Sequence, residues 1–144
     1  MTTVDLIKNL TQTTYDSVEG YRLAAEKSDN PTLERAFARR AGDRAEILNR
    51  LNSAIQSRGE APVTAASTQG KAHQFFLTLT EALGDSNEAA IKRVEEGEEY
   101  LAEQFRDALK REDLDKDTRM LIETAYRDVR EGERFSDMLE QHYA

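Results

Sequence analysis

The scarcity and placement of helix-breaking residues constrain this chain more than any other feature. Its 144 residues include two prolines and seven glycines. Both prolines stand where an apolar periodicity is interrupted, at Asn30-Pro31 and in the stretch from Gly59 to Pro62. Between the interruptions apolar side chains recur every three or four residues, which is typical of amphipathic α-helices. The pattern predicts five helices, over about 3–28, 31–58, 68–83, 86–111 and 115–143.

The matched lengths of four of these helices indicate a bundle. Each long helix would extend roughly 40 Å at about 1.5 Å per residue, and tight turns join them in pairs. The short helix over 68–83 lies in the crossover between the two hairpins. We therefore predict an all-α single domain spanning 1–144, an up-down four-helix bundle of two long hairpins with a short crossover helix, which is the layout of ferritin-like bundles. A simple five-helix array is the alternative.

Composition narrows the function classes. A formal net charge of -8 disfavours nucleic-acid binding, which depends on basic surfaces. The longest apolar runs are far shorter than the roughly 20 residues that span a bilayer, so no membrane association is predicted. The absence of cysteine and of a basic and then apolar leader favours a cytoplasmic location.

The histidines decide the question of a metal centre. A ferritin-like di-iron site needs a glutamate from each of two helices and Glu-x-x-His from each of the other two. The chain has two histidines, His73 and His142, and neither has a glutamate three residues before it. Only an all-carboxylate site stays open, with Glu95, Glu98 and Glu133 as weak candidates. No catalytic residue and no cofactor is predicted, because no Ser or Cys nucleophile arrangement or phosphate loop occurs either.

An acidic run in the fourth predicted helix needs cations opposite it, since glutamates three and four residues apart repel each other. The second and fifth helices supply arginines, so interhelical ion pairs are expected, and a metal-binding face is the alternative. Helical-wheel positions place Arg44 and Glu98 on the core sides of their helices. We predict that these two residues form a buried or half-buried pair, because a buried charge is tolerated only with a partner.

Glycines inside predicted helices cost roughly 1 kcal/mol each relative to alanine, and so call for a packing reason. They are Gly20, Gly42, Gly97 and Gly132. Folding the last hairpin back on itself places Gly97 and Gly132 opposite one another, where they would allow a close backbone approach or make room for a bulky neighbour. Tolerated drift is the alternative explanation.

Four segments carry a family resemblance. They are EGYRLAAE from Glu19, SRGEAP from Ser57, G-x-x-H-x-x-F-x-x-L from Gly70, and EEGEE from Glu95. Together they resemble an uncharacterised, mainly proteobacterial, domain-of-unknown-function family of ferritin-like four-helix-bundle proteins. The resemblance implies a ferritin-like bundle of unknown biochemical role. The family often has a histidine late in the last helix, and Glu133 stands at the matching position, which weakens a histidine-based metal site further.

Two functions follow as hypotheses. The first is a non-enzymatic structural, interaction or stress-related bundle protein of unknown biochemical role. The second is a ferritin-like protein that binds iron or manganese through carboxylates only. An unknown protein partner is expected for the first, and a homodimer is expected because bundles with partly apolar crossover helices often pair through them.

Overall fold

The computed structural model describes residues 1–83 and 86–143, with side-chain detail at all of these except 71, 72, 75, 76, 83 and 143. Within them the chain forms five helices and no strand. They are α1 (Thr3–Lys27), α2 (Pro31–Ser57), α3 (Gly70–Leu83), α4 (Asn87–Leu109) and α5 (Lys116–Tyr143). Every bound lies within two residues of the predicted one. The all-α prediction of a four-helix bundle plus a short helix is confirmed.

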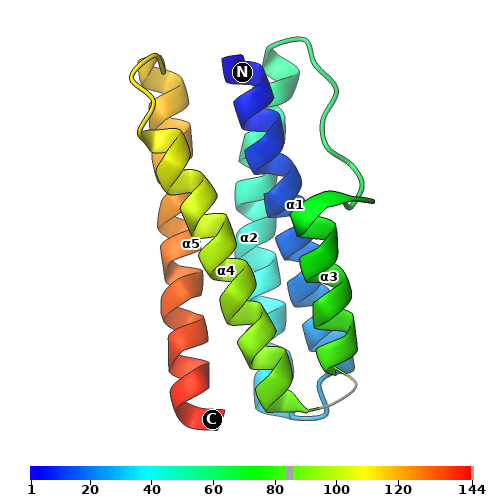
Figure 1. The fold of residues 1–144 in the computed structure, drawn as a ribbon. Coiled ribbons are helices and arrows are strands. Elements are labelled where there is room, and N and C mark those ends of the chain that lie inside the picture. The colour runs from blue at the N-terminus through cyan, green and yellow to red at the C-terminus, as the bar shows by residue number, and fades with distance from the viewer. Residues whose placement is uncertain (84–85, 144) are drawn as a thin grey trace.

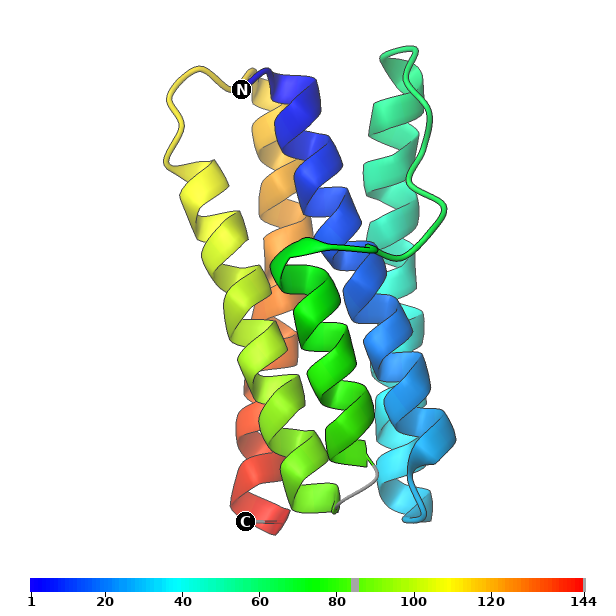
Figure 2. The same cartoon turned by 45° about the vertical axis from the view of Figure 1, so that its right-hand side comes forward.

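The four long helices run side by side as two antiparallel hairpins, α1 with α2 and α4 with α5 (Figure 1). Their packing order is α1, α2, α5 and α4 around the bundle, since α1 also contacts α4 and α2 contacts α5. The short α3 lies against α1 and α4 over the half of the bundle away from the N-terminus (Figure 2). No helix among the described residues is both long and apolar enough to cross a membrane.

Local sequence explains where the helices begin. Thr2 and Asp5 form a reciprocal capping box at the start of α1. Asn30 accepts hydrogen bonds from the N–H groups of Thr32 and Leu33, with Pro31 in the first turn. Ser86 caps α4 by accepting from Ala89. The sequence also predicts that Gly84 ends the crossover helix, that Asp85 opens the capping box of the next helix, and that the Phe76 side chain lies on the apolar face of α3. These three features lie outside the described residues.

The crossover begins with a segment that is anchored to the hairpin beneath it. Asn52 donates to the Val63 carbonyl at 3.0 Å and accepts from the Val63 N–H at 2.8 Å. The buried Asp16 carboxylate accepts from the Ser67 N–H at 2.8 Å and from its hydroxyl at 2.5 Å. Gly70 has a φ of 87°. This left-handed backbone ends the segment, so α3 starts two residues later than predicted.

The core consists of two apolar clusters at different heights in the bundle. The cluster nearer the N-terminus is built around Leu10, Leu51, Phe105 and Val129. The other is built around Tyr21, Phe37, Ile91 and Leu139. On α1, α2 and α4 the two clusters are separated by a level at which polar side chains point inward, and on α5 Asp128 and Gly132 stand at this level. That level holds the candidate site.

Candidate functional site

Arg44 of α2 is the centre of a buried polar layer that joins all four long helices. Its guanidinium donates to both Glu98 carboxylate oxygens at 2.6 Å, and its Nε donates to Asp128 at 2.7 Å. It also donates to the Ser17 hydroxyl at 2.5 Å. Arg44 is 0% exposed and Glu98 is 3% exposed. The predicted Arg44–Glu98 pair is confirmed, in the bidentate geometry that makes such pairs strong.

A second arginine completes the layer and balances its charge. Arg40, one turn before Arg44, donates to the Asp128 carbonyl at 3.0 Å and to its carboxylate at 3.2 Å. It also lies 3.5 Å from the exposed Asp43 carboxylate. We call Ser17, Arg40, Arg44, Glu98 and Asp128 the central polar layer. Two arginines face two inward carboxylates in it, so the layer carries no net charge.

Gly132 of α5 makes this packing possible. A Cβ atom at this position would lie 1.7 Å from Glu98 Oε2 and 2.5 Å from Arg44 Nη2. The salt bridge therefore occupies the space that any side chain at position 132 would need. The prediction that Gly132 leaves room for a bulky neighbour is confirmed, and the neighbour is an ion pair from two other helices.

Tyr21 lies on the other side of the guanidinium and links the layer to the apolar cluster below. The Arg44 Cζ atom stands 5.6 Å from the centre of the Tyr21 ring, a cation–π contact. That ring also packs against Phe37 and Phe135 with centroid distances of 6.3 and 6.2 Å. Burial, together with the Glu98 charge, raises the pKa of the Tyr21 hydroxyl. This phenol is therefore neutral at physiological pH.

Electrostatics keep Arg44 charged. Burial acts to lower the pKa of Arg44, but the charge and hydrogen bonds of Glu98 outweigh it and leave that pKa raised. The space beside Glu98, bounded by Ser17, Tyr21 and Leu79, measures about 10 Å³. It has room for one water at most and none for a substrate. Such a layer is able to fix the relative positions of four helices, and both of its inward carboxylates are bound by arginines.

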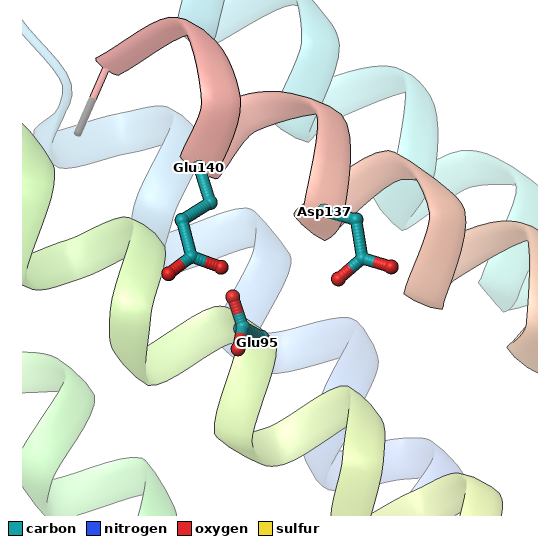
Figure 3. A group of neighbouring side chains, drawn as sticks. All are labelled: Glu95, Asp137 and Glu140. Atoms are coloured by element: carbon teal, nitrogen blue, oxygen red, sulfur yellow. The ribbon is translucent and has the colours of Figure 1, made fainter.

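A separate cluster of carboxylates lies between α4 and α5, near the end of the bundle away from the N-terminus. Glu95 faces Asp137 and Glu140, and one oxygen of each lies within 4.8 Å of the others (Figure 3). Hydrogen bonding with Glu140, then burial, then the charges of Glu140 and Asp137, raise the pKa of Glu95 to about 7. We call these three residues the acidic triad.

The structure separates the three carboxylates that the sequence nominated as weak metal candidates. Glu95 is in the acidic triad, Glu98 is held by Arg44, and Glu133 lies 4.0 Å from Arg106. Burial raises the pKa of Glu133, although Arg106 opposes the rise. The expectation that arginines from other helices neutralise the acidic run holds for Glu98 but is wrong for Glu95, whose neighbours across the helix interface are acids.

Sequence reasoning did not nominate four residues that matter here. They are Ser17 and Asp128 of the central polar layer, and Asp137 and Glu140 of the acidic triad. A signal for Asp128 existed, because it stands four residues before Gly132 and so lies on a neighbouring stretch of the same helix side. The triad had no such signal, since it depends on how α5 is rotated against α4.

Residues 2–111 match the model of a domain of unknown function, DUF2383. The chain belongs to the DUF2383 family. The match covers α1 to α4, including Ser17, Arg40, Arg44 and Glu98, whereas Asp128 and Gly132 lie beyond the matched residues. The prediction of a domain-of-unknown-function family is thus confirmed. No match to a curated protein was found for this DUF2383 chain.

Proposed function

We propose that this DUF2383 protein is a ferritin-like bundle with a non-enzymatic structural or interaction role, in which a salt-bridged layer stands where a metal centre would otherwise be built. One observation carries the proposal: the inward carboxylates of α4 and α5 at mid-bundle, Glu98 and Asp128, are both bound by the fully buried Arg44. A metal ion there would have to displace the guanidinium from both.

Charge and space support the same conclusion. The central polar layer is already neutral, so adding a divalent cation would leave uncompensated positive charge in a buried site, which costs several kcal/mol. The space of about 10 Å³ beside Glu98 has no room for a substrate on that side of the layer, and the larger groove of about 540 Å³ between α2 and α5 reaches only Arg40 and Asp128, which bind each other. A stress-related role stays a prediction, and no residue of the layer supports it.

Metal loading tests this proposal. The purified chain is incubated anaerobically with Fe(II) or Mn(II), desalted, and analysed for bound metal by mass spectrometry. We expect no ion in the central polar layer and no change in melting temperature. Two ions per chain, retained after desalting and retained also by Glu95→Gln, would overturn the proposal, because they would have to bind away from the acidic triad.

The acidic triad favours a second candidate function, the carboxylate-only binding of iron or manganese. Carboxylate oxygens suit Mn(II), and three of them from two helices converge within 4.8 Å. The site would lie at the edge of the α4/α5 interface. It is thus distinct from the central layer in position and ligands.

Calorimetric titration with Mn(II) distinguishes the second candidate. Binding of one ion that is lost in Glu95→Gln, and kept in the control Glu123→Gln, would support a triad site. Glu123 is an exposed α5 carboxylate outside the triad, so its replacement matches the change in net charge. Equal heats for wild type and Glu95→Gln would exclude binding at the triad.

A further inference from the structure

The outer face of α2 carries a charge pattern of which the fold uses only the contact between Asp43 and Arg40. Arg35 and Arg39 stand one turn apart, followed by Gly42 and then by Asp43 and Glu46, and all five are exposed. Like charges three and four residues apart on a helix repel each other. Within the described part of the chain Arg35, Arg39 and Glu46 form no ion pair, and Asp43 reaches Arg40 only at 3.5 Å. A partner of opposite pattern would relieve both repulsions.

A second copy of α2, running antiparallel, has that opposite pattern. The midpoint between Arg35 and Glu46 and the midpoint between Arg39 and Asp43 both fall close to position 41. Two α2 helices related by a two-fold axis at this point would therefore bring Arg35 opposite Glu46 and Arg39 opposite Asp43. The symmetry repeats each pair, as in isologous interfaces.

Gly42 stands at the centre of this face, and no neighbour within its own chain requires a glycine at that position. A Cβ atom added there would meet nothing within 4 Å, in contrast to Gly132. A glycine inside an exposed helix costs roughly 1 kcal/mol relative to alanine. Against a partner helix, however, the missing side chain lets the two backbones approach closely and brings the flanking charges within reach of each other.

We propose that the outer face of α2 is a self-association surface that binds a second copy of this chain, antiparallel, across a two-fold axis near Gly42. This gives the interaction role proposed above a partner, and it rests on that role. It also places the expected homodimer on α2 and not on the crossover helix. The metal-loading experiment measures bound metal and not the oligomeric state, so either proposal is able to fail while the other stands.

Light scattering coupled to gel filtration, over a range of protein concentrations, tests the surface on the full chain. We expect wild type to form a dimer that weakens with added salt. Arg35→Glu/Arg39→Glu and Asp43→Arg/Glu46→Arg should each be monomeric, because each presents one sign of charge to itself. Mixed in equal amounts, the two should form a one-to-one heterodimer, which proves that both are folded.

Two further variants separate this surface from general charge effects. Gly42→Gln should abolish the dimer while keeping or raising the melting temperature of the monomer, since glutamine favours the helix and blocks close approach. Arg127→Glu, on an exposed position of α5, should leave the dimer unchanged. A monomeric wild type at every concentration, or an assembly that both the charge variants and Gly42→Gln leave intact, would overturn the proposal.

Discussion

At the scale of single residues, two glycines inside helices of this protein have opposite surroundings, one buried and crowded and the other exposed and open. Gly132 is required because its missing side chain is the space that the Arg44–Glu98 ion pair fills. Gly42 is required by nothing in its own chain. The cost in helix propensity is the same at both positions, so only the neighbours distinguish them.

Gly132→Ala should lower the free energy of unfolding by about 2–4 kcal/mol. The new methyl group would push Glu98 from Arg44, and the loss combines overpacking with a damaged buried ion pair. Gly42→Ala is the matched control and should raise the free energy of unfolding by up to about 1 kcal/mol at low protein concentration. Urea denaturation measures both. A neutral Gly132→Ala would mean that the layer is able to repack around a side chain.

Arg44→Met should be among the most damaging single substitutions, at about 3–5 kcal/mol, because it leaves Glu98 buried without a cation and Asp128 with Arg40 alone. Adding Glu98→Met should restore a large part of this loss, since the stranded charge is then removed and its volume is filled. The double-mutant cycle, by chemical denaturation, gives the coupling energy of the pair. Additive effects of the two substitutions would contradict the pairing.

The sequence predicted the Arg44–Glu98 pair because both residues lie on the core side of strongly periodic helices. It did not predict Asp128, which stands at the edge of the α5 core face. Its contact with Arg44 depends on which helix packs beside α5, and helical periodicity does not contain that information. The expectation of an arginine opposite Glu95 was wrong for the same reason. Arg134 of α5 pairs with Glu131 on its own helix and not with an acid of α4.

At the scale of helices, local signals proved sufficient for boundaries. Caps at Thr2, Asn30 and Ser86 are short-range features of the sequence, and each marks a helix start in the structure. The largest shift of a start, two residues at α3, follows from the φ of 87° at Gly70, which a pattern of apolar residues does not reveal. Rotation of one helix about its axis against another is the property that local signals leave open.

The α4/α5 interface should respond to pH through Glu95. Its pKa is raised from 4.5 to about 7 in the folded chain, first by the hydrogen bond with Glu140 and then by burial, so the folded state binds the proton more tightly than the unfolded state. The free energy of unfolding should therefore rise as pH falls from above 7 towards 4.5. In Glu95→Gln that rise should be smaller, because the titrating group is gone.

Denaturation curves of wild type and Glu95→Gln between pH 5 and 8, without divalent cations, measure this difference. The two profiles should converge at the acidic end of the range, where Glu95 is protonated in the folded state. Parallel profiles throughout would show that Glu95 does not titrate in this window. Such a result would place its carboxylate farther from Glu140 in solution.

At the scale of the whole molecule, the central polar layer divides the core into two apolar clusters. Every long helix crosses from one cluster to the other through this layer, so a helix that slid by one turn would place an apolar side chain opposite Arg44 or a charge inside a cluster. The layer thus fixes the register of the four helices. Its contribution is to specificity of packing more than to net stability.

The helix beyond the DUF2383 match is part of this arrangement, which leads to a prediction for the entire fold. α5 supplies Asp128 to Arg44, and it places Ile122, Ala125 and Val129 in the cluster nearer the N-terminus, each at most 2% exposed. A chain ending at residue 111 would leave that cluster open to water and the Arg44–Asp128 ion pair unmade. We expect it to unfold without a cooperative transition, whereas a chain ending at Gln141 should unfold cooperatively like wild type.

Urea denaturation followed by circular dichroism, with proton NMR for side-chain dispersion, distinguishes these outcomes. A cooperative transition and dispersed methyl signals for residues 1–111 would show that α1 to α4 form a core without α5. In that case α1 to α4 would be stable alone, and the contact of α2 with α5 through Arg40, Arg44 and Asp128 would only add to their stability. We expect the loss of cooperativity because the charges of the polar layer are divided between the hairpins. Both arginines lie on α2, and one of the two inward carboxylates lies on α5, so neither hairpin is able to neutralise the layer alone.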